Sequence, residues 1–433
     1  MNDYSQIPRG AGGMRCVLAA GIGVLGGMAC LVHAQSSSLS AEAQVGKQLF
    51  FDTNLSASKK MSCASCHDPN NHYAPTNSLP VQLGGPNLTT LGLRAVPTLT
   101  YKFYIPPYND NAANPDGVST NSPGGGFTWD GRADTLAQQT AIPLLSSFEM
   151  ANSSQAAVVQ VVQNASYAAQ FQQVFGASVF SDPATAFTDV GLALEEYQLE
   201  DPSFNAYTSK YDYAVSLELN NGQPVALTAA ENRGYEVFNY TGNCFACHYN
   251  GPMTGGGGAQ FTDFTYENTG APRNPKIPAN ASRIGLPAYY DLGLCTAVNP
   301  DPVNAYLIPH VMPTSASLCG LFKTPTLRNV ATRNVFFHNG VFTSLAQVID
   351  FYNTRDTNPA KWYPAVNGVV QRFNDLPTAL KVNVDTVDIP FGLSPGATPS
   401  MTAQNTADLL CFLETLTDGY VQGVTAQDPI CVN

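Results

Sequence analysis

Two short cysteine motifs constrain this chain more than any other feature of its sequence. They read Cys63-Ala64-Ser65-Cys66-His67 and Cys244-Phe245-Ala246-Cys247-His248. In this C-x-x-C-H spacing two thiols lie about one helical turn apart and can add to the two vinyl groups of one haem, and the adjacent histidine ligates the iron. A redox dithiol or a zinc site is the alternative, but zinc needs further paired ligands nearby and neither motif has them. The sequence therefore predicts two covalently bound haem c groups, with His67 and His248 as iron ligands.

Each motif follows a segment of the same kind. The first begins at Leu39 with the residues Leu-Ser-Ala-Glu, and the second begins at Leu227 with Leu-Thr-Ala-Ala-Glu. A Ser or Thr with a Glu shortly after it is typical of the start of a helix. The chain therefore repeats a unit of helix, C-x-x-C-H and long loop, which predicts a mostly α-helical protein of two cytochrome c-like domains. We place the boundary in the polar segment 219–224, which gives domains at 35–222 and 223–433.

The first 34 residues have the order of a secretory signal, and we assign 1–34 to a signal peptide. Arg9 and Arg15 precede an apolar stretch at 17–32, and polar residues follow Ala34. We expect cleavage after Ala34 and export to the periplasm or cell surface of a bacterium. A retained membrane anchor is the alternative, although the apolar stretch is short for a span. No later stretch is apolar enough to cross a bilayer, so we expect no transmembrane span in the mature chain.

The cysteine count agrees with export. Of the 10 cysteines, two lie in the signal segment and four in the haem motifs. The remaining four form an even number in an oxidising compartment, which predicts two disulfides. From three possible connectivities we choose Cys295 with Cys319 and Cys411 with Cys431. Free buried thiols are the alternative.

Longer motifs lie outside the haem-binding segments. One reads Phe127-Thr128-Trp129-Asp130-Gly131-Arg132-Ala133-Asp134, and another reads Phe322-Lys323-Thr324-Pro325-Thr326-Leu327-Arg328-Asn329-Val330. The second continues to Phe337-His338-Asn339-Gly340 and then to Tyr352. Together these motifs resemble those of the bacterial di-haem cytochrome c peroxidase/MauG family, over nearly all of the mature chain. The resemblance implies a haem peroxidase, an enzyme that acts on hydrogen peroxide.

The resemblance also assigns catalytic roles. In the family the first haem is the peroxide site, and the second stores or relays electrons. Trp129 matches a tryptophan between the haems, and Glu149 matches a distal glutamate that assists O–O cleavage. A carboxylate suits this step, because heterolysis moves a proton from one peroxide oxygen to the other. Gln139 and Pro143 match distal-pocket residues. Without the motif, Glu149 would be interpreted as a solvated helix residue and Trp129 as core packing.

The first haem departs from part of the family. In peroxidases that need reductive activation, a histidine some sixteen residues past the first C-x-x-C-H occupies the distal position. Residues 79–85 of this chain contain no histidine. His72 lies closer to the motif and is interpreted as a loop residue. We therefore expect an open distal side at the first haem.

The second haem departs in its sixth ligand. The resemblance assigns His338 to the binding of this haem. The peroxidases have a methionine fourteen residues after it, whereas MauG has a tyrosine, and here the position is Tyr352. The resemblance therefore implies ligation by Tyr352. Core packing on an apolar helix face is the alternative interpretation, and Met312 and Met401 are alternative ligands.

The family also binds one Ca²⁺ between its domains, through an Asn side chain and backbone carbonyls. The Asn position corresponds to Ala95 or a close neighbour, and the carbonyl pair corresponds to Arg333-Asn334-Val335. A cationic side chain at this place argues against Ca²⁺, although carbonyl ligands do not depend on residue type.

The resemblance favours a MauG-like function, in which hydrogen peroxide produces a high-valent di-haem state that oxidises a partner protein. One alternative is a cytochrome c peroxidase that reduces hydrogen peroxide with electrons from a small cytochrome or copper protein. Another is a non-enzymatic di-haem electron carrier, against which the open first haem and Glu149 both argue. Nucleic acid is not an expected partner, because the formal net charge is −12 and nucleic-acid binding requires clustered Lys and Arg.

Overall fold

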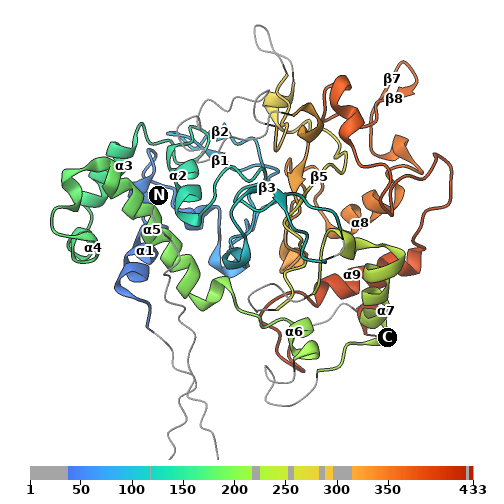
Figure 1. The fold of residues 1–433 in the computed structure, drawn as a ribbon, viewed down its shortest axis with the longest axis horizontal. Helices are drawn as coiled ribbons and strands as arrows, with labels where there is room; N and C mark the ends of the chain where they lie inside the picture. Colours follow the sequence, from blue (N-terminus) through green and yellow to red (C-terminus); the bar gives the residue numbers. More distant parts are fainter. Residues whose placement is uncertain are drawn as a thin grey trace, which may run out of the picture. The chain divides into compact units, whose positions relative to one another are not determined.

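The structure is a computed structural model, and its described residues are mostly helical with little sheet (Figure 1). It describes residues 38–117, 119–216, 225–251, 258–281, 288–295, 315–425 and 429–432. The predicted signal peptide at 1–34 and the predicted boundary at 219–224 lie outside the described residues. The prediction of a mostly α-helical fold is confirmed.

The helices of the first half surround the first motif. They are α1 (Ala41–Phe51), α2 (Leu136–Leu145), α3 (Gln155–Gln163), α4 (Ala168–Phe175) and α5 (Pro183–Glu200). The Ser40 hydroxyl caps α1 by accepting a hydrogen bond from the Ala43 amide. Helix α1 lies along α5, and Gly46 permits the close approach, because a Cβ atom there would lie 1.8 Å from the Ala193 carbonyl oxygen (Figure 1).

The helices of the second half follow the same plan. They are α6 (Lys210–Val215), α7 (Ala229–Glu236), α8 (Leu345–Thr354) and α9 (Ala403–Glu414). Thr228 and Glu231 form a capping box at the start of α7. Helix α7 lies along α9, and a Cβ atom on Gly234 would lie 1.9 Å from the Asp408 carbonyl oxygen.

Two large hydrophobic cores follow from these helix pairs. One contains buried side chains between Val45 and Phe204, and the other contains buried side chains between Tyr211 and Leu416. Leu39–Asn433 nevertheless form one unit in which contacts are continuous. The division at residue 222 therefore stays a prediction, although the two cores fall on either side of it.

The described strands are short and form four antiparallel pairs. These are β1 (Leu83–Gly84) with β2 (Thr90–Leu91), β3 (Asn109–Ala112) with β4 (Ser122–Gly124), β5 (Tyr266–Glu267) with β6 (Phe322–Lys323), and β7 (Ala365–Val366) with β8 (Val369–Val370). The β3–β4 hairpin belongs to the first half but touches the second, because the Gly125 amide donates to the Phe264 carbonyl at 2.9 Å. The Tyr266 hydroxyl donates to the Gly125 carbonyl at 2.6 Å.

Both disulfides lie in the second half. The structure joins Cys295 to Cys319 and Cys411 to Cys431, which are the two pairs chosen from the sequence. Among the described residues, no helix combines the length and the apolar character needed to cross a membrane.

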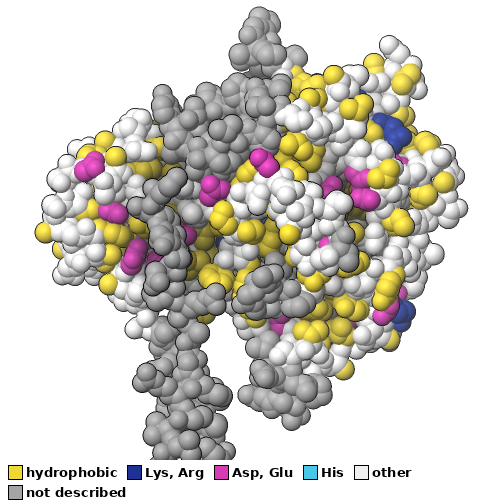
Figure 2. Space-filling model, viewed as in Figure 1, with side chains coloured by type: hydrophobic (Ala, Val, Ile, Leu, Met, Phe, Trp, Pro, Cys, Tyr) yellow, Lys and Arg dark blue, Asp and Glu magenta, His cyan; other side chains and the backbone are white. Residues whose placement is uncertain are grey.

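Charge is distributed unevenly between the surface and the interior. On the face drawn in Figure 2, acidic side chains appear at many separate places, whereas Lys and Arg appear at only a few. Several basic side chains are instead buried, and they are Arg132, Lys210, Lys323, Arg328 and Arg355. The interior of this acidic protein therefore contains a substantial share of its positive charge.

Candidate functional site

The two C-x-x-C-H segments have the same local geometry. Each begins with a 3₁₀ turn, η2 (Cys63–Ser65) in the first and η9 (Cys244–Ala246) in the second. The His67 and His248 amides each donate to the carbonyl of the first motif cysteine at 2.9 Å. Sulfur atoms and imidazole are thereby gathered on one short turn, which is the arrangement that thioether attachment and proximal ligation require.

Both motif histidines are oriented by a backbone carbonyl. His67 Nδ1 lies 3.1 Å from the Tyr73 carbonyl oxygen, and His248 Nδ1 lies 3.1 Å from the Phe261 carbonyl oxygen. A ligating histidine is commonly held in this way, with its other ring nitrogen left for the metal. Burial lowers the pKa of both imidazoles to about 4, so that both are neutral at pH 7 and have a lone pair to donate.

The four motif cysteines are free of disulfides in the structure. Burial is the main cause that raises the pKa of Cys63, Cys66 and Cys244 to about 12, and it also raises the pKa of Cys247. These thiols are therefore not the exposed, acidic thiols of a redox dithiol. In the described part of the chain, no group of three or more His, Cys, Asp and Glu side chains could hold a metal ion.

A cavity of about 240 Å³ opens beside the second motif. Cys244, Cys247 and His248 lie on its wall. Apolar side chains form much of the remaining wall, among them Phe238, Leu327, Leu345, Ile349, Leu409 and Leu413. Two thiols, a neutral imidazole and an apolar wall around one cavity fit a covalently attached haem.

Tyr352 and Met401 both lie on this cavity. Tyr352 belongs to α8, which begins after the Ser344 cap, and its ring stacks between Phe337 and Phe391 at centroid distances of 6.0 and 5.4 Å. Burial raises the pKa of Tyr352, and the charges of the two motif cysteines raise it further. Met401 is buried and exchanges two backbone hydrogen bonds of 2.9 Å with the Asn353 side chain. Ligation by either side chain stays a prediction, and Met312 lies outside the described residues.

His338 lies on the wall of the same cavity. Its ring stacks on Phe322 at 3.6 Å, and it is 6% exposed. Its Nε2 atom has no hydrogen-bond partner among the described residues and lies 3.3 Å from an Asp375 oxygen. The His338 ring is thus held on the cavity wall by Phe322 and the Asp375 carboxylate.

Trp129 borders the cavity from the first half of the chain. Its indole Nε1 donates to the Ala95 carbonyl at 2.8 Å. The next residue, Asp130, is fully buried and pairs with Arg132 and Arg94, whose charges hold the pKa of Asp130 well below its usual range against the effect of burial. The ion pairs therefore fix the turn that carries Trp129.

Glu149, Gln139 and Pro143 lie elsewhere, on α2 and the turn that follows it. Gln139 and Pro143 are four residues apart and share a helix face. The Glu149 amide donates to the Ser146 carbonyl at 3.0 Å, and its carbonyl accepts from the Gly85 amide at 2.8 Å. The Glu149 side chain is exposed, and its negative charge is one cause of the raised pKa of Cys66.

The structure thus separates the predicted residues into two groups. Trp129, Tyr352, His338 and the second motif meet at one cavity, whereas Glu149 lies beside the first motif. His72 is the residue after the 3₁₀ turn η3 (Pro69–Asn71) and has a left-handed backbone, with φ of 50°. Its carbonyl accepts from the Thr98 hydroxyl at 2.7 Å, as expected of a loop residue.

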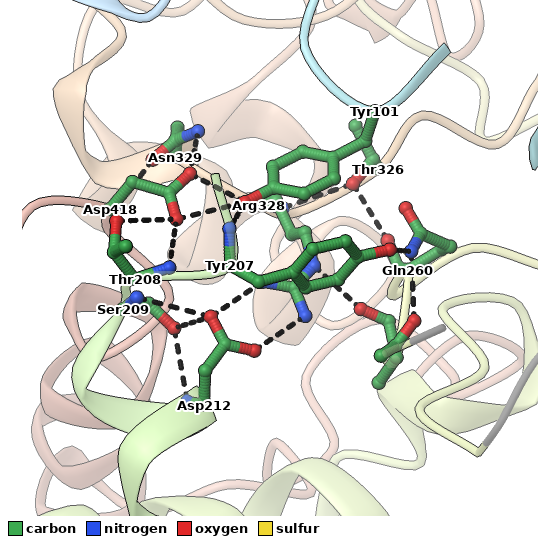
Figure 3. Close-up of polar contacts among 12 residues, drawn as sticks. Tyr101, Tyr207, Thr208, Ser209, Asp212, Gln260, Thr326, Arg328, Asn329 and Asp418 are labelled. Atoms are coloured by element: carbon green, nitrogen blue, oxygen red, sulfur yellow. Dashed lines mark hydrogen bonds and ion pairs between the residues drawn. The ribbon is translucent and has the colours of Figure 1, made fainter. Parts of the chain in front are cut away.

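A buried network that no sequence motif indicates lies behind the cavity wall (Figure 3). The Arg328 guanidinium lies between the rings of Tyr101 and Tyr207, with centroid distances of 4.7 and 4.5 Å, and pairs with Asp212 at 2.8 Å. The Tyr101 hydroxyl donates to Asp418 at 2.7 Å. The neighbours Thr326 and Leu327 line the cavity, so the network supports that wall from behind. Nothing in the local sequence joins residues so far apart.

This architecture is that of a mostly helical protein with one C-x-x-C-H segment in each half, and comparisons with known proteins give its family. The family model described as di-haem cytochrome c peroxidase matches residues 40–219. The methylamine utilization protein MauG of Paracoccus denitrificans is 33% identical over 392 residues, which cover 87% of this chain and 89% of MauG. The cytochrome c551 peroxidase of Nitrosomonas europaea is 30% identical over 312 residues, which cover 71% of each chain.

Solved structures give the same result. The diheme peroxidase BthA from Burkholderia thailandensis has a TM-score of 0.74 and 35% identity to this chain, and the match covers 88% of this chain and 87% of that chain. The chain therefore belongs to the di-haem cytochrome c peroxidase/MauG family. It is an oxidoreductase of the peroxidase type, with haem as its cofactor.

Proposed function

We propose that this protein uses hydrogen peroxide to oxidise a partner protein, in a MauG-like manner, with two haems attached through the four motif cysteines. The observation that carries the proposal is that Tyr352 and His248 lie on the wall of one cavity. A phenolate opposite a histidine favours the oxidised states of haem iron, whereas a thioether favours the reduced state. Ligation by Tyr352 would therefore suit a haem that holds oxidising equivalents for a protein substrate.

Haem iron, when bound, supplies the redox chemistry with peroxide, and the residues of the chain have separate roles around it. Glu149 takes a proton from one peroxide oxygen and returns it to the other. The Gly85 and Ser146 backbone contacts hold the turn that carries this carboxylate. Gln139 and Pro143 shape the same side from α2. Trp129 offers an aromatic path for electrons toward the second motif.

A second candidate function is the reduction of hydrogen peroxide with electrons from a small cytochrome or copper protein. Met401 favours this candidate, because its buried side chain lies on the same cavity as Tyr352. Ligation by its thioether would raise the reduction potential of the second haem and suit it to accept electrons. In either case we propose that the chain is exported. Ca²⁺ is left out of the proposal, because Arg333 belongs to the segment that matches the carbonyl ligands of the family.

The test is to add one equivalent of hydrogen peroxide to the fully oxidised, haem-loaded protein and to record optical, near-infrared and Mössbauer spectra. Immediate change at both haems without added reductant is expected for the MauG-like function. A protein that reacts only after one haem is reduced, and then turns over with a cytochrome donor, is a conventional di-haem peroxidase. Inertness in both states would reject peroxide chemistry and favour an electron carrier.

A further inference from the structure

Two cationic side chains on the haem cavity have no counter-ion among the residues that the structure describes. Lys102 begins the 3₁₀ turn η4 (Lys102–Tyr104), and Arg333 follows the 3₁₀ turn η13 (Val330–Thr332). Both line the cavity beside the second motif. Neither forms an ion pair with any described carboxylate, whereas the buried side chains of Arg132, Lys210, Arg328 and Arg355 all do.

Lys102 and Arg333 also lie close enough to influence each other. Burial and, to a lesser degree, the charge of Arg333 lower the pKa of Lys102 to about 8. Burial lowers the pKa of Arg333 to about 10. Both charges contribute to lowering the pKa of His67, although burial is its main cause. The two cations therefore act on the first motif while lining the cavity of the second.

A third cation and Trp129 complete the group. The Trp129 indole donates to the Ala95 carbonyl, and an Arg333 Nη atom donates to the adjacent Val96 carbonyl, each at 2.8 Å. The Lys323 amide donates to the Trp129 carbonyl at 2.8 Å, and its buried ammonium contacts the Gly126 carbonyl. Lys102 and Lys323 also repel each other, which lowers the pKa of Lys323 further than burial alone. Three cations thus gather where the two halves meet.

Partly buried cations without a nearby counter-ion favour an anion beside them, because an unpaired charge is costly away from water. Acidic side chains also line the cavity, but Asp291 is paired with Arg94 and Asp375 with Arg273. The remaining acids, Glu267, Asp385 and Asp388, act on one another and on Cys247, and none forms an ion pair with Lys102, Arg333 or Lys323. The Asn268 Nδ2 donor also lines the cavity and has no hydrogen-bond partner among the described residues. Cations without a counter-ion and a free amide donor suit a carboxylate ligand.

We propose that Lys102 and Arg333 bind a propionate carboxylate of the bound haem, and so tie its reduction potential to the junction that carries Trp129. This inference rests on the proposed haem attachment and not on the peroxide reaction. Arg333 supplies two or more donors in a fixed plane, which suits a carboxylate, and Lys102 supplies a point charge. Both are positioning residues for the cofactor. A nearby cation favours the reduced haem, because reduction adds a negative charge.

The experiment compares Lys102→Met and Arg333→Met with the unchanged haem-loaded protein by optical redox titration. Lys276→Met is the matched control, because Lys276 is exposed. Haem content is first counted, and variants with two haems are titrated. We expect about a tenfold fall in the equilibrium constant for one-electron reduction of at least one haem, which is about 59 mV. Resonance Raman spectra should show a shift of the haem propionate bending band in the same variants.

Charge-conserving variants separate binding from simple packing. Lys102→Arg and Arg333→Lys should have reduction potentials close to that of the unchanged protein. They replace the Met variants in the titration if a Met variant fails to fold. A change smaller than threefold in both Met variants, with an unshifted propionate band, overturns the proposal. Redox titrations at rising phosphate concentrations test whether the cations bind a free anion instead of a propionate. A reduction potential that depends on phosphate, and only when Lys102 is present, would also overturn the proposal. A protein that is inert to peroxide but shows these shifts would refute only the proposed function.

Discussion

In both halves of the chain, the helix before the C-x-x-C-H segment packs through a glycine against a longer helix of the same half. The charges on these two helix pairs differ. Between α1 and α5, burial and the neighbouring carboxylates Asp189 and Glu200 raise the pKa of Glu42. Between α7 and α9, Arg233 pairs with Asp408 at 2.8 Å and lowers the pKa of Asp408. The two helix pairs therefore have the close backbone contact in common, whereas the charged residues around the contact differ between them.

The two motif ends diverge further. The second motif opens on a cavity with Tyr352 and Met401, so a candidate sixth ligand is already present. The first motif has Glu149 as its charged neighbour, on an exposed turn. The surroundings of the two motifs therefore differ, and the proposed function assigns a different role to each.

Substitution of Glu149 should have the largest effect and should act on the first haem alone. We expect Glu149→Gln to slow the reaction with hydrogen peroxide by about 10²- to 10⁴-fold, because the proton shuttle is lost. Haem content and the spectrum of the second haem should not change. Stopped-flow spectroscopy measures the rate, and Glu236→Gln, at an exposed position on α7, is the control. An unchanged rate would remove Glu149 from the mechanism.

Substitution of Tyr352 should affect the second haem alone. If the phenolate is a ligand, Tyr352→Phe removes it and should alter the low-spin spectrum of one haem completely. Tyr235→Phe, at a partly buried aromatic of the same core, is the control. Electron paramagnetic resonance of the oxidised protein checks this. A spectrum identical to that of the unchanged protein would reject ligation by Tyr352.

Substitution of Asp130 should destabilise the turn that carries Trp129. Asp130→Asn leaves Arg132 and Arg94 without their shared anion, and we expect a loss of about 3 kcal/mol in the free energy of unfolding. The folded-state pKa of Asp130 lies below its unfolded value, so this stabilisation is complete above about pH 4 and is lost as the pH falls further. Urea unfolding at pH 5 to 8 should give a constant difference. Asp350→Asn, at an exposed pair, should cost below about 1 kcal/mol.

Substitution of Gly46 or Gly234, the glycines at the helix contacts, should destabilise the protein about as much as substitution of Asp130. Gly46→Ala and Gly234→Ala each place a Cβ atom within 2 Å of a carbonyl oxygen of the partner helix, at 1.8 and 1.9 Å. We expect a loss of about 2 to 3 kcal/mol from each, because the helices must separate. Gly92→Ala is the control, since its nearest atom would be 3.5 Å away. Equal free energies of unfolding in urea for all three variants would show that the two helix pairs do not depend on glycine at their contacts.

The smallest effect concerns the charges on α5. Burial and the neighbouring Glu200 raise the pKa of Glu196 to about 7 in the folded protein, above an unfolded value of about 4.3. Its ionisation therefore weakens folding as the pH rises from about 4 to 7. Glu196→Gln should stabilise the protein above pH 7, by less than about 1 kcal/mol after solvent screening, and should have no effect below pH 4. Urea midpoints at pH 4 and pH 8 test this difference.

The sequence alone was sufficient for features that depend on neighbours along the chain. The two C-x-x-C-H segments, the Ser40 and Thr228 helix starts and the mostly helical class all follow from local spacing, and the structure agrees with the helix starts and the class. The family resemblance also singled out Trp129 and Tyr352, and both lie on the cavity beside the second motif. Local chemistry was decisive here because thioether spacing and helix capping act over a few residues.

Only the tertiary structure decided which distant side chains meet. Arg328 with Asp212 and Tyr101 with Asp418 are contacts between segments far apart in sequence (Figure 3). The contact of Lys323 with Trp129 is another. Lys102 and Arg333 belong to no local sequence pattern, and only the fold brings them together on one cavity, partly buried and without an ion pair among the described residues. Single charged residues in loops are ordinary on a surface. Inside a cavity an unpaired charge has a high free-energy cost, because the low dielectric replaces its hydration poorly.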